Sequence, residues 1–546
     1  MLFTSFEFLG FILILFLAYY LIPKKYQWML LLAASYFFYF MAGAYCLIYI
    51  LVTTVTVYLL GRRIEDLRKE QSDYLKEHRE KLGKEEKKAY KDGMKRRQWR
   101  TLLVGLFVNL GILAVVKYTN FAIYNVNLAL HGFGSEKQFD FLDIALPMGI
   151  SFYTFQALGY LIDVYRGTSK AERNPFRFAL FVSFFPQLVQ GPISRFQDLS
   201  GTLYMEHSFD AKTVSFGLQR ILWGFFKKLV IADRILVGVN EIVKNPESYG
   251  GAYVFAGMMF YALELYADFT GGIDITIGVA QVFGITVTEN FNRPYFSRSI
   301  KEYWRRWHIT MGTWFTDYIF YPISVCKPML KFSKFSREHF GEAIGKRMPV
   351  YLSSFAVWFA TGIWHGASWN FVVWGLGNWI VIMISQEFAP LYLKFHRKVN
   401  GMINRQRAGI SDRMFVLENN SFYRLFQILR TIFLMSCLRS FDCYRDVPLT
   451  FRMFGSMFTG GNWHILWDGS LLGLGLDITD YVILAAGCVL LILVSLIQRT
   501  GSVREKIAAK PYPVRFILWY GLFLIVLLMG AYGIGYDASQ FIYNQF

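Results

Sequence analysis

Two histidines, His308 and His365, lie in tryptophan-rich and largely apolar stretches of the chain. The first follows Trp304-Arg305-Arg306-Trp307, and the second stands in Trp364-His365-Gly366. An ionisable side chain inside a bilayer is costly and functional by default, and imidazole suits proton transfer near neutral pH. The pattern therefore favours acid–base chemistry within a membrane. The alternative is two interfacial histidines that bond to the backbone and serve structure alone.

Acylation of a hydroxyl by a thioester is one reaction that a buried imidazole suits. It needs a base to take the alcohol proton and donors to hold the developing oxyanion. A buried histidine stays neutral because desolvation disfavours the imidazolium, so it can accept that proton. The chain has no Gly-x-Ser-x-Gly elbow, which disfavours a serine nucleophile and favours direct transfer.

Long apolar runs must position these histidines. The 546 residues are 54% hydrophobic, and several runs, such as 8–22, 356–384 and 516–532, approach or exceed the length that crosses a bilayer. A β-barrel would instead show short segments of alternating polarity. We therefore predict an all-α polytopic membrane protein, one domain over residues 1–546, with about eleven transmembrane or partly spanning helices.

The net charge of +18 comes from basic residues in loops between the apolar runs. This is the positive-inside pattern, and no nucleic-acid-binding module accompanies it, so we expect no nucleic-acid partner. Residues 62–100 are predicted to form a charged cytoplasmic insertion, shaped as a helical hairpin. Residues 444–480 carry little positive charge and are predicted to be an extracytoplasmic loop. The expected location is the cytoplasmic membrane, crossed many times.

Processing and metal signals are missing from the sequence. Residues 5–22 have no basic segment before them and no small-residue cleavage site, and they are expected to be a retained first helix. The five cysteines are scattered without metal-type spacing, so neither a metal site nor a disulfide framework is expected.

The loop pattern also places the two histidines. Residues 350–388 are predicted to form a hairpin whose turn, residues 364–367, lies deep in the membrane or on its far side. Residues 307–326 are too few for two crossings, so they must lie in the interface or dip in and return. Irregular backbone at membrane depth needs protein or water around it, so His308 is expected to line a cavity that opens to the cytoplasm.

Other charged residues interrupt apolar runs. Glu264 and Asp268 share one helix face and need partners when buried, with structural salt bridging favoured over direct catalysis. Four arginines are available as those partners: Arg195, Arg293, Arg305 and Arg306. Lys227 and Lys228 fit either a donor phosphate or lipid headgroups, and we favour the headgroups.

Five segments, taken in order, resemble the membrane-bound O-acyltransferase family, and within it the alginate-type polysaccharide O-acetyltransferases. They are residues 146–167, residues 184–195, residues 266–274 with 289–295, residues 303–318 and residues 362–367. No single motif carries this resemblance, which spans about residues 1–500.

The resemblance implies a ring of helices around a thin central tunnel, with re-entrant segments, where a cytoplasmic thioester meets an acceptor from the other side. It implies that His365 is the catalytic histidine and that His308 is its partner. The residues expected to line or support the tunnel are Trp304, Arg305, Trp307, Asp317, Trp364, Glu264, Asp268 and Asn290.

The predicted function is a membrane O-acyltransferase that moves a short acyl group, most simply acetyl, towards hydroxyls of an extracytoplasmic polysaccharide. The donor would be acetyl-CoA or an acyl-carrier protein, used as substrate, with no bound cofactor. The resemblance also implies a separate extracytoplasmic esterase-like partner. Two alternatives stay open: D-alanyl transfer to teichoic acid from a carrier protein, and a transporter or channel. Intramembrane charges and broken helices fit the transporter, although paired halves with internal symmetry are missing.

Overall fold

The computed structural model describes residues 3–407 and 414–532, and these segments contain helices and connecting loops without a β-strand. The all-α fold class is confirmed. The first four helices are α1 (Phe6–Leu21), α2 (Gln27–Phe40), α3 (Cys46–Glu77) and α4 (Lys84–Gly132). The middle of the chain forms α5 (Ile150–Arg166), α6 (Pro175–Ser183), α7 (Phe185–Leu188), α8 (Phe196–Leu203), α9 (Ala211–Phe225), α10 (Asp233–Lys244) and α11 (Ala252–Val282).

The remaining helices surround or extend this central part. They are α12 (Ile300–Arg306), α13 (Ile309–Phe315), α14 (Tyr321–Ser324), α15 (Lys327–His365), α16 (Trp369–Glu387), α17 (Ala389–Arg407), α18 (Ser421–Tyr444), α19 (Val447–Thr459), α20 (Ile478–Gln498), α21 (Val503–Ala508) and α22 (Tyr512–Met529). Two π-helical stretches, Phe226–Ala232 and Thr316–Phe320, continue α9 and α13.

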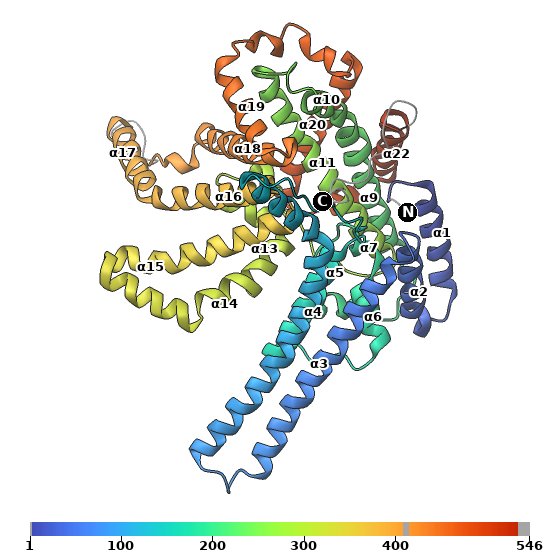
Figure 1. The fold of residues 1–546 in the computed structure, drawn as a ribbon. Helices are drawn as coiled ribbons and strands as arrows, with labels where there is room; N and C mark the ends of the chain where they lie inside the picture. Colours follow the sequence, from blue (N-terminus) through green and yellow to red (C-terminus); the bar gives the residue numbers. More distant parts are fainter. Residues whose placement is uncertain (1–2, 408–413, 533–546) are drawn as a thin grey trace.

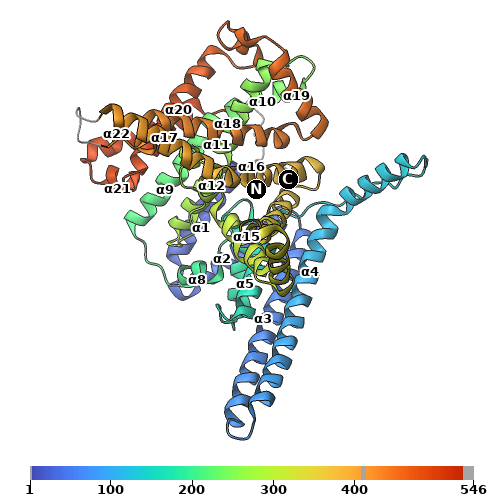
Figure 2. The same ribbon diagram turned by 90° about the vertical axis from the view of Figure 1, so that its left-hand side faces the viewer.

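Helices α3 and α4 run side by side and project well beyond the rest of the molecule (Figures 1 and 2). The turn between them, residues 78–83, lies at the tip. The predicted hairpin shape of residues 62–100 is therefore confirmed. The charged residues 62–100 form the projecting end of this helix pair. The side of the membrane on which this end lies stays a prediction.

Four helices in the described residues are long and apolar enough to span a membrane: α3, α4, α20 and α22. The pair α16 and α17, bent by 46°, makes a fifth if it counts as one broken span, and α1 is apolar but shorter. The protein is an integral, multi-pass membrane protein. The number of about eleven spanning or partly spanning segments stays a prediction.

Helix α11 is the buried centre of the fold, and α9 and α10 pack beside it (Figure 1). It contacts α9 through two glycines on each helix, seven residues apart. Gly217 and Gly224 lie on α9, and Gly278 and Gly271 face them from α11. A Cβ added at Gly224 would lie 2.6 Å from the carbonyl oxygen of Gly271, and one added at Gly278 would lie 2.8 Å from that of Gly217. The two backbones touch because these positions carry no side chain.

The hairpin predicted over residues 350–388 is present. Helix α15 ends at His365, α16 begins at Trp369, and the two pack against each other. Gly362 and Gly366 allow this packing, because an added Cβ would lie 2.6 Å from the Phe371 carbonyl oxygen and 2.1 Å from the Phe371 ring respectively.

Adding one methyl group at the α9–α11 contact should destabilise the protein. We expect Gly224→Ala and Gly271→Ala to lower the free energy of unfolding by about 1–3 kcal/mol, because each Cβ would meet backbone that cannot move aside. Thermal unfolding of the purified protein in detergent measures the effect. The matched control is Gly111→Ala on α4, where an added Cβ meets nothing within 4 Å. Equal melting temperatures for all three variants would contradict the argument.

Candidate functional site

His308 is fully buried and sits in the turn between α12 and α13 with a left-handed backbone, φ 47° and ψ 55°. Few residues other than glycine adopt this conformation, and strained positions of this kind cluster at functional sites. One residue, Asn290, holds this turn through its backbone and its side chain. The Asn290 carbonyl oxygen accepts from the Ile309 N–H at 2.9 Å, and Asn290 Oδ1 accepts from the N–H and hydroxyl of Thr310 at 3.0 and 2.9 Å.

The same Asn290 Oδ1 lies 3.3 Å from Nδ1 of His308. The backbone N–H of Thr310 identifies this atom as the amide oxygen, so the imidazole must be the donor. Nδ1 therefore carries the proton in the neutral ring, and Nε2 is the basic nitrogen. Asn290, itself fully buried, thus sets both the position and the tautomer of His308.

His365 is the last residue of α15 and is also buried. Its ring packs edge-to-face against the indoles of Trp364 and Trp374, with centroids 4.9 and 4.6 Å away. The Trp364 ring lies 5.9 Å from that of His308 as well, so one indole contacts both imidazoles. The sequence placed these histidines in different loops, and the fold brings both against a shared tryptophan.

Helix α4 holds the end of α15 in place. Lys117 Nζ donates to the Trp364 carbonyl oxygen at 2.6 Å, and the Tyr118 hydroxyl donates to that of Ile363 at 2.8 Å. The last carbonyls of a helix have no partner within it, and a cation is favoured beside them. The residue before His365 is therefore fixed from outside its own hairpin.

Arg439 on α18 is a member of this site that the sequence analysis missed. Its guanidinium lies over the rings of Trp304, Trp307 and Trp374, at 5.6, 5.4 and 4.7 Å, which is the range of cation–π attraction. It is buried and lies 3.6 Å from Asp442. The signal was available, because Arg439 and Asp442 interrupt an apolar run, which is the criterion that selected the histidines.

The fold brings together most of the predicted site residues. The cluster of contacting side chains contains His308, Asn290, Trp304, Trp307, Trp364 and His365. Trp304 is fixed further by its indole N–H, which donates to Asn378 Oδ1 at 3.1 Å.

Two predicted residues lie to one side of that cluster. Asp317 forms an ion pair with Arg195 that is partly exposed. Arg305 lines a cavity of about 460 Å³ between α12–α13 and α15, whose walls include Trp304 and Trp307 but neither histidine. Neither imidazole lines this cavity, and an opening of His308 to the cytoplasm stays a prediction.

The expected arginine partner of Asp268 on α11 was wrong. Asp268 pairs with Lys228 at 2.6 Å, not with any of the four arginines, and Lys228 also reaches Asp233 at 2.8 Å. Glu264 lies on the same buried face one turn away. Since the sequence gives no register between helices, it could not show that the π-helical stretch after α9 faces α11.

The interpretation of Lys227 and Lys228 as headgroup contacts was also wrong. Both side chains are buried, and Lys227 donates to Asp274 at 2.6 Å and to Thr270 at 2.9 Å. These two lysines neutralise carboxylates inside the protein. The glycine contact between α9 and α11 is what places them within reach.

Comparison with known proteins bears on this geometry. Residues 172–417 match the model of the MBOAT, membrane-bound O-acyltransferase family, and this region holds both histidines and Asn290. The chain is 38% identical to the probable alginate O-acetylase AlgI of Pseudomonas syringae pv. tomato, over 52% of this chain and 51% of that protein. It is 31% identical to the peptidoglycan O-acetyltransferase of Helicobacter pylori, over 55% and 58% of the two chains.

A third relative is the teichoic acid D-alanyltransferase of Bacillus subtilis, 27% identical over 46% of this chain and 61% of that protein. The aligned part of the chain spans only about half to three fifths of the length of these relatives. Similarity is greater to the alginate O-acetylase than to the D-alanyltransferase. These findings support the resemblance that the five motifs indicated: residues 172–417 match the membrane-bound O-acyltransferase family, and among these relatives the chain is most similar in sequence to the alginate O-acetylase.

Proposed function

We propose that this protein is a membrane O-acyltransferase that moves a short acyl group, most simply acetyl, from a cytoplasmic thioester across the membrane towards hydroxyls of an extracytoplasmic polysaccharide. The observation that carries the proposal is the pair of buried imidazoles that both contact Trp364, inside the region that matches the family. The names of the relatives support the acceptor class, since alginate, peptidoglycan and teichoic acid are all polymers of the cell surface.

In this proposal His365 is the general base. Its imidazole takes the proton of the incoming hydroxyl while the alkoxide oxygen attacks the thioester carbonyl carbon. The C–O bond forms, the C–S bond breaks, and the thiolate leaves with the proton returned to it. Asn290 orients His308 with Nε2 as its basic nitrogen, and this nitrogen holds or passes the proton on the donor side. Arg439 adds a fixed positive charge behind the three indoles, which favours the developing negative charge.

The membrane arrangement is part of the proposal. A thin central tunnel would open to the cytoplasm beside His308 and to the other side beside His365, with residues 62–100 in the cytoplasm and 444–480 outside. The membrane would be the cytoplasmic membrane, and the donor would be acetyl-CoA or an acyl-carrier protein. A separate esterase-like protein outside the membrane would carry the acyl group onward.

D-alanyl transfer is the second candidate, because D-alanyltransferases of teichoic acid match the same part of the chain. The two functions differ in the group that appears on the polymer. Mass spectrometry of cell-surface glycans, with and without this protein, separates them, since acetyl and D-alanyl esters differ in mass. The purified protein should also hydrolyse its thioester donor slowly, which a passive channel would not do.

His365→Gln should remove detectable acyl transfer. The amide can hydrogen-bond but cannot accept the proton, and loss of a general base costs about 10²–10⁴-fold in rate. Mass spectrometry of surface glycans from cells that express each variant measures the acyl content. His339→Gln, exposed on the part of α15 that precedes the kink at Gly341, is the matched control and should behave as the unchanged protein. If the His365 variant kept more than about a tenth of the activity of the unchanged protein, His365 would be a positioning residue and not the general base.

Asn290→Ala should lower the turnover rate by roughly 10²-fold, because His308 loses the acceptor that fixes its ring and misplaced groups cost about that much. Asn290→Asp keeps an acceptor oxygen for the same donors and should recover part of the rate. Turnover and the Michaelis constant, measured on purified protein with the thioester donor, separate positioning from binding. Unchanged turnover in the alanine variant would show that the Asn290 contact serves stability alone.

The tip of the α3–α4 hairpin should be cytoplasmic. We expect an impermeant thiol reagent added to intact cells to leave Lys81→Cys unlabelled, because the basic excess of residues 62–100 opposes translocation. His464→Cys, exposed in the predicted outer loop, should be labelled under the same conditions. Labelling of the hairpin tip from outside would reverse the topology and move the donor to the other side.

A further inference from the structure

A second, larger cavity lies outside the histidine cluster, between α9, α20, α21 and α22. Its volume is about 710 Å³, within the size range of small-molecule sites. One part of its wall is apolar and comes mostly from α20 and α22, with Leu490, Val494, Ile517, Leu518, Leu522 and Ile525. Another part is polar and contains Arg220, Asp274, Glu289 and Arg504. The cavity is therefore amphipathic.

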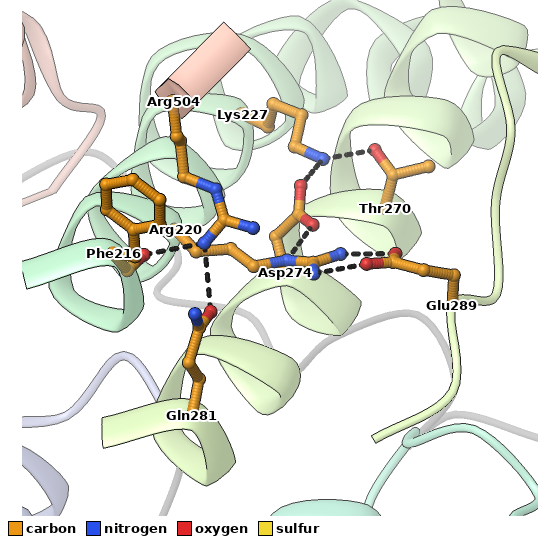
Figure 3. Close-up of polar contacts among 8 residues, drawn as sticks. All are labelled: Phe216, Arg220, Lys227, Thr270, Asp274, Gln281, Glu289 and Arg504. Atoms are coloured by element: carbon orange, nitrogen blue, oxygen red, sulfur yellow. Dashed lines mark hydrogen bonds and ion pairs between the residues drawn. The ribbon is translucent and has the colours of Figure 1, made fainter. Parts of the chain in front are cut away.

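The polar end is a cluster of ionised side chains (Figure 3). Arg220 donates through two nitrogens to the Glu289 carboxylate, at 2.5 and 2.6 Å, and through Nε to Asp274 at 2.8 Å. Lys227 donates to the second oxygen of Asp274 at 2.6 Å. Two carboxylates are thus matched by two cations.

Arg504 adds a third cation to this cluster. Its Nη1 donates to the Phe216 carbonyl oxygen at 2.7 Å and to Gln281 Oε1 at 2.9 Å, both neutral acceptors (Figure 3). Within residues 3–407 and 414–532, no carboxylate forms an ion pair with it. The cluster carries one positive charge more than negative. A partly buried guanidinium with donors to spare attracts an anion, above all a phosphate.

The apolar wall indicates where the ligand comes from. Helices α20 and α22 are two of the four candidate spans, and only 22% and 6% of their apolar windows are buried inside the protein. Helices this exposed and this apolar face lipid hydrocarbon. A free phosphate would use the arginine but leave the apolar wall unfilled, whereas a lipid from the surrounding bilayer satisfies both.

We propose that this cavity binds one anionic glycerophospholipid, with its phosphate at Arg504 and an acyl chain along α20 and α22. The occupant would also contact Phe291 and Ile309, which line the cavity and directly flank Asn290 and His308 in the chain. A bound lipid would therefore support the segment that holds the site. The binding is independent of the acyl-transfer proposal and is tested without a turnover measurement.

Native mass spectrometry of the full-length purified protein tests the binding, with phosphatidylglycerol and phosphatidylcholine offered in equal amounts. We expect one phosphatidylglycerol to be retained in preference to phosphatidylcholine. Arg504→Gln should weaken that retention roughly tenfold, because it removes a charged hydrogen bond to the phosphate. Gly521→Leu should also weaken it, since this α22 glycine lines the cavity and an added Cβ meets nothing within 4 Å.

Two control variants match these changes. Arg452→Gln removes an arginine paired with Glu247 on the surface, and Gly111→Leu adds the same bulk to α4 at a position with open space. Both should retain the lipid as the unchanged protein does. Equal retention of the two lipids by the unchanged protein would overturn the proposal, and that comparison holds even if a variant fails to fold. Retention unaffected by Arg504→Gln and Gly521→Leu would overturn it as well.

Discussion

The backbone contact between α9 and α11 is the constraint on which the polar interior depends. Four glycines let the two helices approach until carbonyl oxygen lies where a side chain would otherwise be. Only at that distance can Lys227 and Lys228, in the π-helical stretch after α9, reach Asp274 and Asp268 on α11. Buried charges without partners would cost several kcal/mol each, so the glycines make the charged interior possible.

Helix α11 also contacts the histidine cluster directly. Phe269, next to Asp268, packs edge-to-face against His308 at 5.0 Å. From the other side, α15, α16 and α18 bring Trp364, Trp374 and Arg439 against the same group of rings. The two imidazoles are therefore held by elements from several parts of the chain, and both make edge-to-face contacts with aromatic rings. Such surroundings exclude water and leave a small number of directed polar contacts, of which Asn290 to His308 is the clearest.

The two cavities have different linings next to this centre. The smaller one is bounded by the indoles of α12 and reaches Arg305, whereas the larger one is bounded by α20 and α22 and ends at Arg220 and Arg504. Ile309, the residue after His308, lines both. The start of the short helix α13 is thus common to the linings of both cavities, next to the turn that carries His308.

The sequence by itself determined the all-α membrane class, the charged hairpin of α3 and α4, the α15–α16 turn that carries His365 and the family that residues 172–417 resemble. These depend on hydropathy, charge distribution and local motifs, which are properties of neighbouring residues. Tertiary structure decided the rest. The partners of Asp268, the burial of Lys227 and Lys228, and the place of Arg439 over three indoles depend on helix register and separation. Those quantities follow from packing between segments far apart in the chain, and no local pattern encodes them.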